Sequence, residues 1–217
     1  MKEVFIYGCG GVGNELAVFL KNSTEYIVQG FVDDNPKIRE CMGLRSRTLD
    51  ELLSAEKSNS INVIISIGEP IIRKVISEKL RIAGVKEVVV NMSDCFNPHY
   101  SSVGEGTLLH VGSFISVNSS IGKSCMINKG VMVGHDCRIG DYTVISPRSV
   151  LGGNVTVGDN TFIGTGALIR NGITIGSNVI IGMGSVVVKD VEDDSVVFGN
   201  PARFVRKNDS QRVFGKH

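Results

Sequence analysis

Residues 131–160 read VMVGHDCRIGDYTVISPRSVLGGNVTVGDN, and an aliphatic residue recurs in them at every sixth position, as at Val133, Ile139 and Val157. The same register runs without insertion from Val103 to Glu192, in fifteen blocks that each begin with Val, Leu or Ile. The fifth residue of each block is small or aliphatic, so two positions per block can face inward. A hexapeptide period of this kind is typical of a parallel β-helix.

Three such blocks make one triangular coil, so the repeats predict five stacked coils of eighteen residues. No block can bury its apolar face alone, and stacking pairs successive backbones as parallel strands about 4.8 Å apart. A β-sandwich is the alternative, but it predicts variable strand spacing and hairpin turns. The strict sixfold register argues against a sandwich.

Before the repeats, the pattern changes to alternating strands and helices. Strands are predicted over residues 4–7, 27–32, 62–67 and 87–90, and helices over 14–22, 49–54 and 70–83. This alternation predicts a small parallel α/β sheet. We therefore expect a Rossmann-like α/β domain over residues 1–96 and a parallel β-helix domain with a C-terminal tail over 97–217.

A glycine-rich turn follows the first predicted strand. Gly8, Gly10 and Gly13 precede a helix, and the acidic pair Asp33-Asp34 ends the next strand, as in dinucleotide-binding units. Backbone N–H groups at a helix N-terminus attract phosphate. Because the predicted domain is half of a full dinucleotide-binding domain, a nucleotide-diphosphate sugar fits it better than a nicotinamide dinucleotide. A turn that merely packs helix on strand is the structural alternative.

Composition excludes several other classes. The net charge of +1 offers no basic stripe for a nucleic acid, and no apolar run is long enough to cross a membrane. Five scattered cysteines without a Cys-x-x-Cys pair indicate reduced thiols and a cytoplasmic protein, and no metal site is expected.

The glycine-rich domain, the repeats and the ending Gly199-Asn200-Pro201-Ala202-Arg203 together resemble the sialic acid O-acetyltransferase family of hexapeptide-repeat sugar acyltransferases. The closest resemblance is to the nucleotide-sugar N-acetyltransferases of bacillosamine and perosamine synthesis. It implies a left-handed β-helix, acetyl-CoA as co-substrate, and a homotrimer with active sites between subunits. It also implies a set of nucleotide-sugar contacts at Gly10, Gly11, Asp33, Asp34, Gly68 and Glu69. One departure is Val12, where many relatives carry His.

The resemblance places the chemistry on His135. As the third residue of its block, His135 must lie outside the prism, and Asp136 follows it. By the family match His135 is the general base, Asp136 orients it, and Gly153 supplies an oxyanion N–H. The remaining assignments are Asn128 for the acceptor sugar, Gly153, Thr165, Gly182 and Met183 for CoA, and Arg170, Lys189, Arg203 and Arg206 as possible phosphate contacts or solvated corners. His110 occupies a corner and is expected at the surface or in a cleft.

These features favour an acetyl-CoA-dependent N-acetyltransferase that acts on the amino group of a UDP- or GDP-linked amino sugar by direct transfer. The alternatives are an O-acetyltransferase of sialic acid or a related sugar, and a nucleotide-sugar-binding protein without catalysis. An NAD(P)-dependent oxidoreductase would rest on the glycine turn alone.

Overall fold

The computed structural model describes residues 1–93, 96–97 and 99–214, which form two compact units. The first comprises Met1–Gly68 and Val75–Val88, and the second comprises Glu69–Lys74 and the chain from Val89 onward. The second unit begins before the expected boundary at residues 96 and 97, because β7 (Val90–Asn91) already pairs with β9 (Leu108–Leu109). The division into functional domains at 1–96 and 97–217 stays a prediction.

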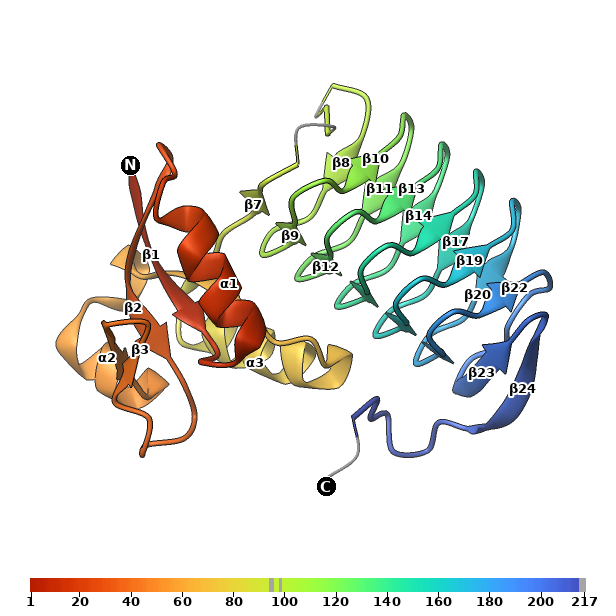
Figure 1. Ribbon diagram of the computed structural model, residues 1–217. Helices are drawn as coiled ribbons and strands as arrows, with labels where there is room; N and C mark the ends of the chain where they lie inside the picture. Colours follow the sequence, from red (N-terminus) through yellow and green to blue (C-terminus); the bar gives the residue numbers. More distant parts are fainter. Residues whose placement is uncertain (94–95, 98, 215–217) are drawn as a thin grey trace. The chain divides into compact units, whose positions relative to one another are not determined.

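The first unit is built on a six-stranded sheet of order β3-β4-β2-β1-β5-β6 (Figure 1). Its parallel strands are β1 (Lys2–Tyr7), β2 (Tyr26–Val32), β4 (Leu44–Arg47), β5 (Asn62–Ile65) and β6 (Lys86–Glu87). The helices are α1 (Gly11–Leu20), α2 (Leu49–Ala55), the 3-10 helix η1 (Ser58–Ser60) and α3 (Pro70–Ile82), whose first residues belong to the second unit. The small parallel α/β sheet is therefore confirmed.

Three details of this unit differ from the prediction. β3 (Glu40–Cys41) and β4 form a hairpin that the sequence did not indicate, because its turn places Met42 at φ 53° beside Gly43 at φ 75°. A methionine seldom adopts this conformation. Helix α1 begins at Gly11 instead of residue 14, and the strand expected over 87–90 is divided between β6 and β7.

The second unit is a β-helix, stacked coil on coil, whose strands from β7 to β22 are two residues long (Figure 1). One face carries β10 (Phe114–Ile115), β13 (Met132–Val133), β16 (Val150–Leu151), β19 (Leu168–Ile169) and β22 (Val186–Val187). The next carries β8 (Ser102–Val103), β11 (Ser120–Ile121), β14 (Arg138–Ile139), β17 (Thr156–Val157) and β20 (Thr174–Ile175). The third carries β7, β9, β12 (Met126–Ile127), β15 (Val144–Ile145), β18 (Phe162–Ile163), β21 (Ile180–Ile181), β23 (Ser195–Gly199) and β24 (Ala202–Lys207).

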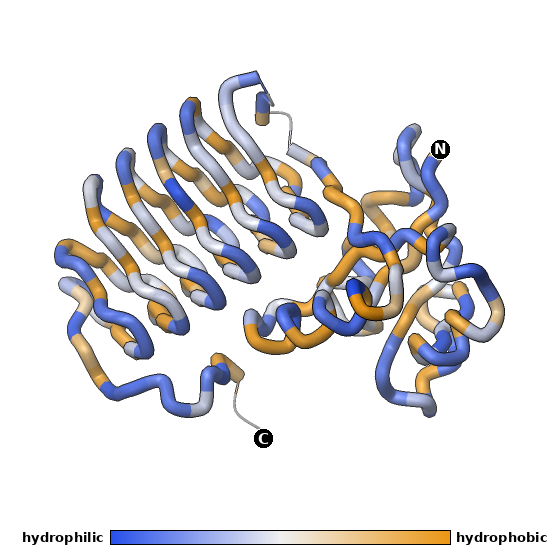
Figure 2. Tube along the Cα trace, turned by 180° about the vertical axis from the view of Figure 1, so that it is seen from behind, coloured by the Kyte–Doolittle hydropathy of each residue, from blue (hydrophilic) through white to orange (hydrophobic). Residues whose placement is uncertain are grey.

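The predicted period is present in the pairing of the coils. Ile121 pairs with Ile139, and Ile139 with Val157, eighteen residues apart. The block-initial aliphatic side chains fill one continuous core, and apolar and polar residues alternate along each coil (Figure 2). Several polar side chains at the fifth position donate to a carbonyl of the next coil, as Ser119 Oγ does to Gly134 O at 2.8 Å. Small residues at this position are therefore needed both for space and for hydrogen bonding.

The sixfold register ends after Val187. Val191 bridges to Ile175, sixteen residues earlier, so the fifteenth block is shortened. The antiparallel pair β23–β24 follows it. Farther along, Phe214 meets Phe162 edge-on, with ring centroids 5.6 Å apart. The C-terminal segment is therefore packed within the second unit.

Four cysteines, Cys9, Cys41, Cys125 and Cys137, are free thiols, and Cys95 lies outside the described residues. Burial raises the pKa of the Cys125 thiol to about 12. In the part of the chain that the structure describes, no helix has the length and apolar character needed to span a bilayer.

Candidate active site

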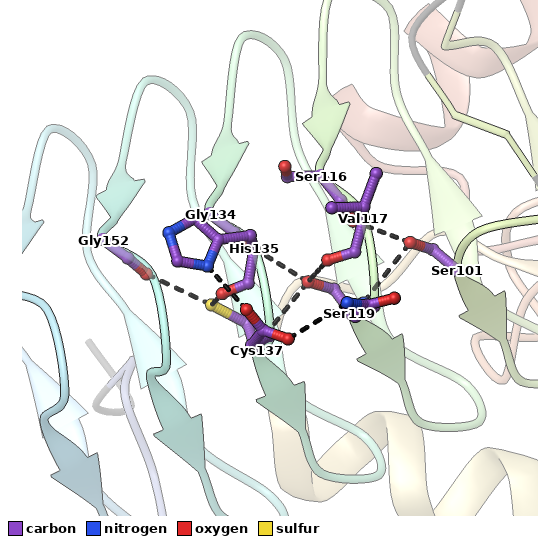
Figure 3. Close-up of polar contacts among 10 residues, drawn as sticks. Ser101, Ser116, Val117, Ser119, Gly134, His135, Cys137 and Gly152 are labelled. Atoms are coloured by element: carbon purple, nitrogen blue, oxygen red, sulfur yellow. Dashed lines mark hydrogen bonds and ion pairs between the residues drawn. The ribbon is translucent and has the colours of Figure 1, made fainter.

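His135 projects from the corner between β13 and β14, on the outside of its coil (Figure 3). Its side chain is 53% exposed, as the third position of a block requires. The ring Nδ1 lies 2.7 Å from Oδ2 of Asp136, the next residue. Asp136 has φ 59°, and this left-handed turn of the backbone sets the geometry in which the two adjacent side chains meet.

Hydrogen bonding lowers the pKa of the acid in the His135–Asp136 pair. The bond from His135, and secondly one from Asn118, hold the pKa of the Asp136 carboxyl below its usual range. A carboxylate at Nδ1 favours the tautomer with the proton on Nδ1, which makes Nε2 the basic nitrogen. Within residues 1–93, 96–97 and 99–214, Nε2 has no hydrogen-bond partner.

Gly153 lies one coil beyond His135, directly against the imidazole ring. A Cβ at this position would be 2.5 Å from Nε2 and 2.6 Å from Cε1, so only glycine allows the ring its present position. The Gly153 N–H makes no hydrogen bond in the described part of the chain. At the equivalent place on another corner, the Lys123 N–H is capped by Oδ1 of Asp141 at 2.9 Å. The basic nitrogen therefore lies directly against the backbone of Gly153.

Side chains inside the prism connect this corner to the neighbouring coils. Cys137 Sγ lies 3.2 Å from Gly152 O, and the Cys137 N–H donates to Ser119 Oγ at 3.1 Å (Figure 3). These contacts tie together the coils on both sides of His135. The exposed pair therefore stands on a rigid backbone.

The structure separates the expected CoA and sugar contacts into two rows. His135, Asp136 and Gly153 lie on the corner that follows the face of β10, β13, β16, β19 and β22. The corner that precedes this face carries the other candidates, which are Asn128, Thr165, Gly182 and Met183. Within one chain, these four residues therefore lie on a different corner from His135.

The face between the two rows carries exposed apolar side chains. They point outward from successive strands of one sheet, and the most exposed are Phe114 (40%), Met132 (49%) and Leu168 (45%). Exposed apolar patches of this kind mark interaction surfaces. We call this row, with Val150 and Val186, the apolar stripe.

One assignment needs correction, and a second residue is less accessible than expected. His110 is fully buried, so it is neither a surface nor a cleft residue; its Nδ1 accepts the Val111 N–H at 3.0 Å. Glu69 is only 6% exposed, and its two carboxylate oxygens accept the N–H groups of Val213 at 2.7 Å and Phe214 at 3.0 Å. A nucleotide contact from Glu69 would require this segment to move away.

Two further candidates are less accessible than expected. Asn128 is 9% exposed. Gly182 packs against Phe198, whose Cβ would be 2.5 Å from an added Cβ, so packing alone requires this glycine. By contrast, Thr165 and Met183 are exposed at their corner.

In the first unit, the glycines of the turn have different roles. Gly8 has φ 112°, and a Cβ on Gly13 would be 2.1 Å from Gly8 O, so both are required by the backbone. Hypothetical Cβ atoms on Gly10 and Gly11 meet no atom within 4 Å, and the same holds for Gly68 in the segment after β5. These three positions leave open space for a ligand.

The acidic pair after β2 supports this turn. Asp33 Oδ2 accepts the Cys9 N–H at 3.0 Å. Asp34 accepts the Tyr7 hydroxyl at 2.7 Å and lies 3.7 Å from Lys79 Nζ. Burial, and then Asp34, raise the pKa of Tyr7. Both carboxylates are therefore held in place at the carboxyl ends of the strands.

One residue of the site was not predicted from the sequence. Asn118 lies eighteen residues before Asp136 and donates from Nδ2 to Asp136 Oδ1 at 3.3 Å. The period of the coil could have identified it. Among the described residues, no three His, Cys, Asp or Glu side chains form a group suited to a metal ion.

Known protein families match both parts of this chain. The PglD N-terminal domain matches residues 3–80, and bacterial transferase hexapeptide repeats match residues 118–153 and 154–189. No match was found among curated protein sequences. The matches and the stacked coils identify the chain as a left-handed β-helix acyltransferase with hexapeptide repeats.

Three solved structures resemble nearly the whole chain. PerB from Caulobacter crescentus, in complex with CoA and GDP-perosamine, is 31% identical with a TM-score of 0.86, over 94% of this chain and 97% of that one. The acetyltransferase domain of PglB from Neisseria gonorrhoeae, in complex with acetyl coenzyme A, is 29% identical (TM-score 0.83; 94% and 99% covered). WeeI from Acinetobacter baumannii is 28% identical (TM-score 0.78; 94% and 100% covered). The chain belongs to the hexapeptide-repeat sugar acyltransferases, in their nucleotide-sugar N-acetyltransferase branch.

Proposed function

We propose that the protein transfers an acetyl group from acetyl-CoA to the amino group of a sugar linked to UDP or GDP. The observation that carries this proposal is the His135–Asp136 pair, with Nε2 directly against Gly153. The relatives add the substrates, since PerB was crystallised with CoA and GDP-perosamine and the PglB domain with acetyl coenzyme A.

The reaction needs one base and one oxyanion donor. His135 Nε2 removes a proton from the sugar amine as the amine nitrogen attacks the acetyl carbonyl carbon. The resulting oxyanion accepts the Gly153 N–H, and its collapse breaks the carbon–sulfur bond and releases the CoA thiolate. Asp136 stabilises the imidazolium that forms at His135. Transfer is direct, so no acyl-enzyme is required.

The nucleotide occupies the open turn of the first unit. Gly10 and Gly11 leave space at the N-terminus of α1 for phosphate, as does Gly68 after β5. Asp33 and Asp34 lie at the same strand ends, where a ribose or base would be bound. Because one Asp33 oxygen already accepts the Cys9 N–H, Asp33 also acts by shaping the turn.

The active assembly is a homotrimer. The apolar stripe is exposed in a single chain. Three chains that turn this face toward a common axis would bury it. The corner with His135 would then lie beside the opposite corner of the neighbouring chain, which carries Asn128, Thr165 and Met183. CoA would bind in the groove between the two chains. The free thiols of the described residues support a cytoplasmic location.

A substrate panel tests the function. Purified protein is mixed with acetyl-CoA and UDP- or GDP-linked 4-amino sugars, matched hydroxyl sugars, sialic acid and no acceptor. Thiol release and product mass are measured. The proposal expects thiol release and acetylation only with amino sugars. Acetylation of sialic acid or the hydroxyl sugars alone would establish the O-acetyltransferase alternative.

A further inference from the structure

Asp136 has two carboxylate oxygens, and each has a different partner. Oδ2 meets His135 Nδ1 at 2.7 Å, while Oδ1 accepts Nδ2 of Asn118 at 3.3 Å. Asn118 comes from the preceding coil, so it contacts the pair from a separately anchored strand corner.

The backbone fixes both ends of this contact. Asn118 and Asp136 have left-handed φ angles of 57° and 59°. The Asn118 N–H donates to Tyr100 O at 2.7 Å, and the Asp136 N–H donates to Val117 O at 3.0 Å. The two side chains are therefore stacked by the coil geometry itself.

We infer that Asn118 is a positioning residue for the His135–Asp136 pair; this inference rests on the proposed function. An exposed carboxylate rotates readily about its terminal torsion. The amide of Asn118 holds one oxygen, so the other stays directed at His135 Nδ1. Because Asn118 is neutral, it orients the carboxylate without forming an ion pair that would weaken its attraction to the imidazolium.

The same kind of Asn–Asp hydrogen bond between coils occurs on another corner, which has no histidine. Asn178 donates from Nδ2 to Asp194 Oδ1 at 3.1 Å, and both residues have positive φ angles. An Asn–Asp hydrogen bond of this kind is thus part of the coil architecture. At the His135 corner, the aspartate in this hydrogen bond is the acid that contacts the base.

The test compares Asn118→Gly with Asn178→Gly, because glycine keeps the left-handed backbone and removes only the amide side chain. With Asn118→Gly we expect kcat for acetyl transfer to fall about three- to tenfold, the loss of one modest hydrogen bond, with KM for acetyl-CoA unchanged. Asn178→Gly should leave kcat unchanged. In an Asp136→Gly background, the Asn118 substitution should have no further effect on kcat.

A substrate-free measurement separates this inference from the proposed function. Side-chain ¹⁵N NMR of His135 should show the Nδ1-protonated tautomer in the wild type and a mixed population in Asn118→Gly. An identical tautomer in both proteins, or an equal loss of kcat with and without Asp136, would overturn the positioning role. Absence of acetylation by the wild type with every acceptor would instead count against the proposed function.

Discussion

At the scale of single residues, the corner that carries His135 lacks a capping side chain that the corresponding corner at Lys123 has. Asp141 caps the Lys123 N–H from the next coil, whereas Gly153 in the corresponding place has no side chain to offer. The His135 ring occupies that space. The repeat therefore accommodates an exposed base without any change in its backbone path.

Gly153→Ala tests this arrangement. Its Cβ would fall 2.5 Å from His135 Nε2, and the exposed ring can turn away at little cost to folding. We expect kcat to fall by about tenfold or more, as a displaced general base predicts, with the melting temperature nearly unchanged. Full activity in a folded Gly153→Ala protein would contradict the proposed contact.

The sixfold register was sufficient to place His135 outside the prism, since the third position of a block cannot face inward. The burial of Glu69 could not be predicted from such a register. Its carboxylate is bound by backbone groups 144 and 145 residues later in the chain, in a segment without periodicity. The burial of His110 could not be predicted for a related reason, because a corner position does not determine what covers it.

At the scale of elements, the turn between β1 and α1 contains glycines required by the backbone and glycines that leave ligand space. Gly13 is packed against the Gly8 carbonyl, while Gly10 has open space around it. The fingerprint in the sequence could not separate these roles, because both kinds of glycine occupy motif positions. The β3–β4 hairpin was missed because Met42 carries the positive φ that normally signals glycine or asparagine.

A pair of substitutions in this turn has opposite expected effects. Gly13→Ala should lower the melting temperature strongly, because backbone atoms must move to admit the methyl group. Gly10→Ala should leave stability unchanged but weaken nucleotide-diphosphate binding about tenfold or more, since the phosphate could no longer approach closely. Scanning calorimetry and titration with UDP and GDP measure both effects. Unaltered affinity in Gly10→Ala would place the nucleotide elsewhere.

At the scale of the whole molecule, the sequence predicted five coils but could not show how the candidate residues divide between corners. The structure places His135 and Met183 on opposite sides of the apolar stripe. The proposed trimer would resolve this separation, because a neighbouring chain would supply the missing corner.

Assembly is tested by Leu168→Glu, which puts a charge on the apolar stripe. The wild type should sediment at about 70 kDa, three times the 23.3 kDa chain. Leu168→Glu should sediment as a monomer and lose most of its kcat/KM for acetyl-CoA. Thr156→Glu is the matched control, since Thr156 is exposed on the neighbouring polar face. A fully active monomer at assay concentration would contradict the shared groove.

Steady-state thiol release by His135→Ala, with the amino sugar that the wild type acetylates fastest, tests most directly whether His135 is the base. The substitution leaves the core untouched because the ring lies outside the prism. We expect kcat to fall about a hundredfold or more at neutral pH, with CoA affinity retained in calorimetry. A variant that binds CoA and keeps near-wild-type kcat would show that the proton is removed by another group.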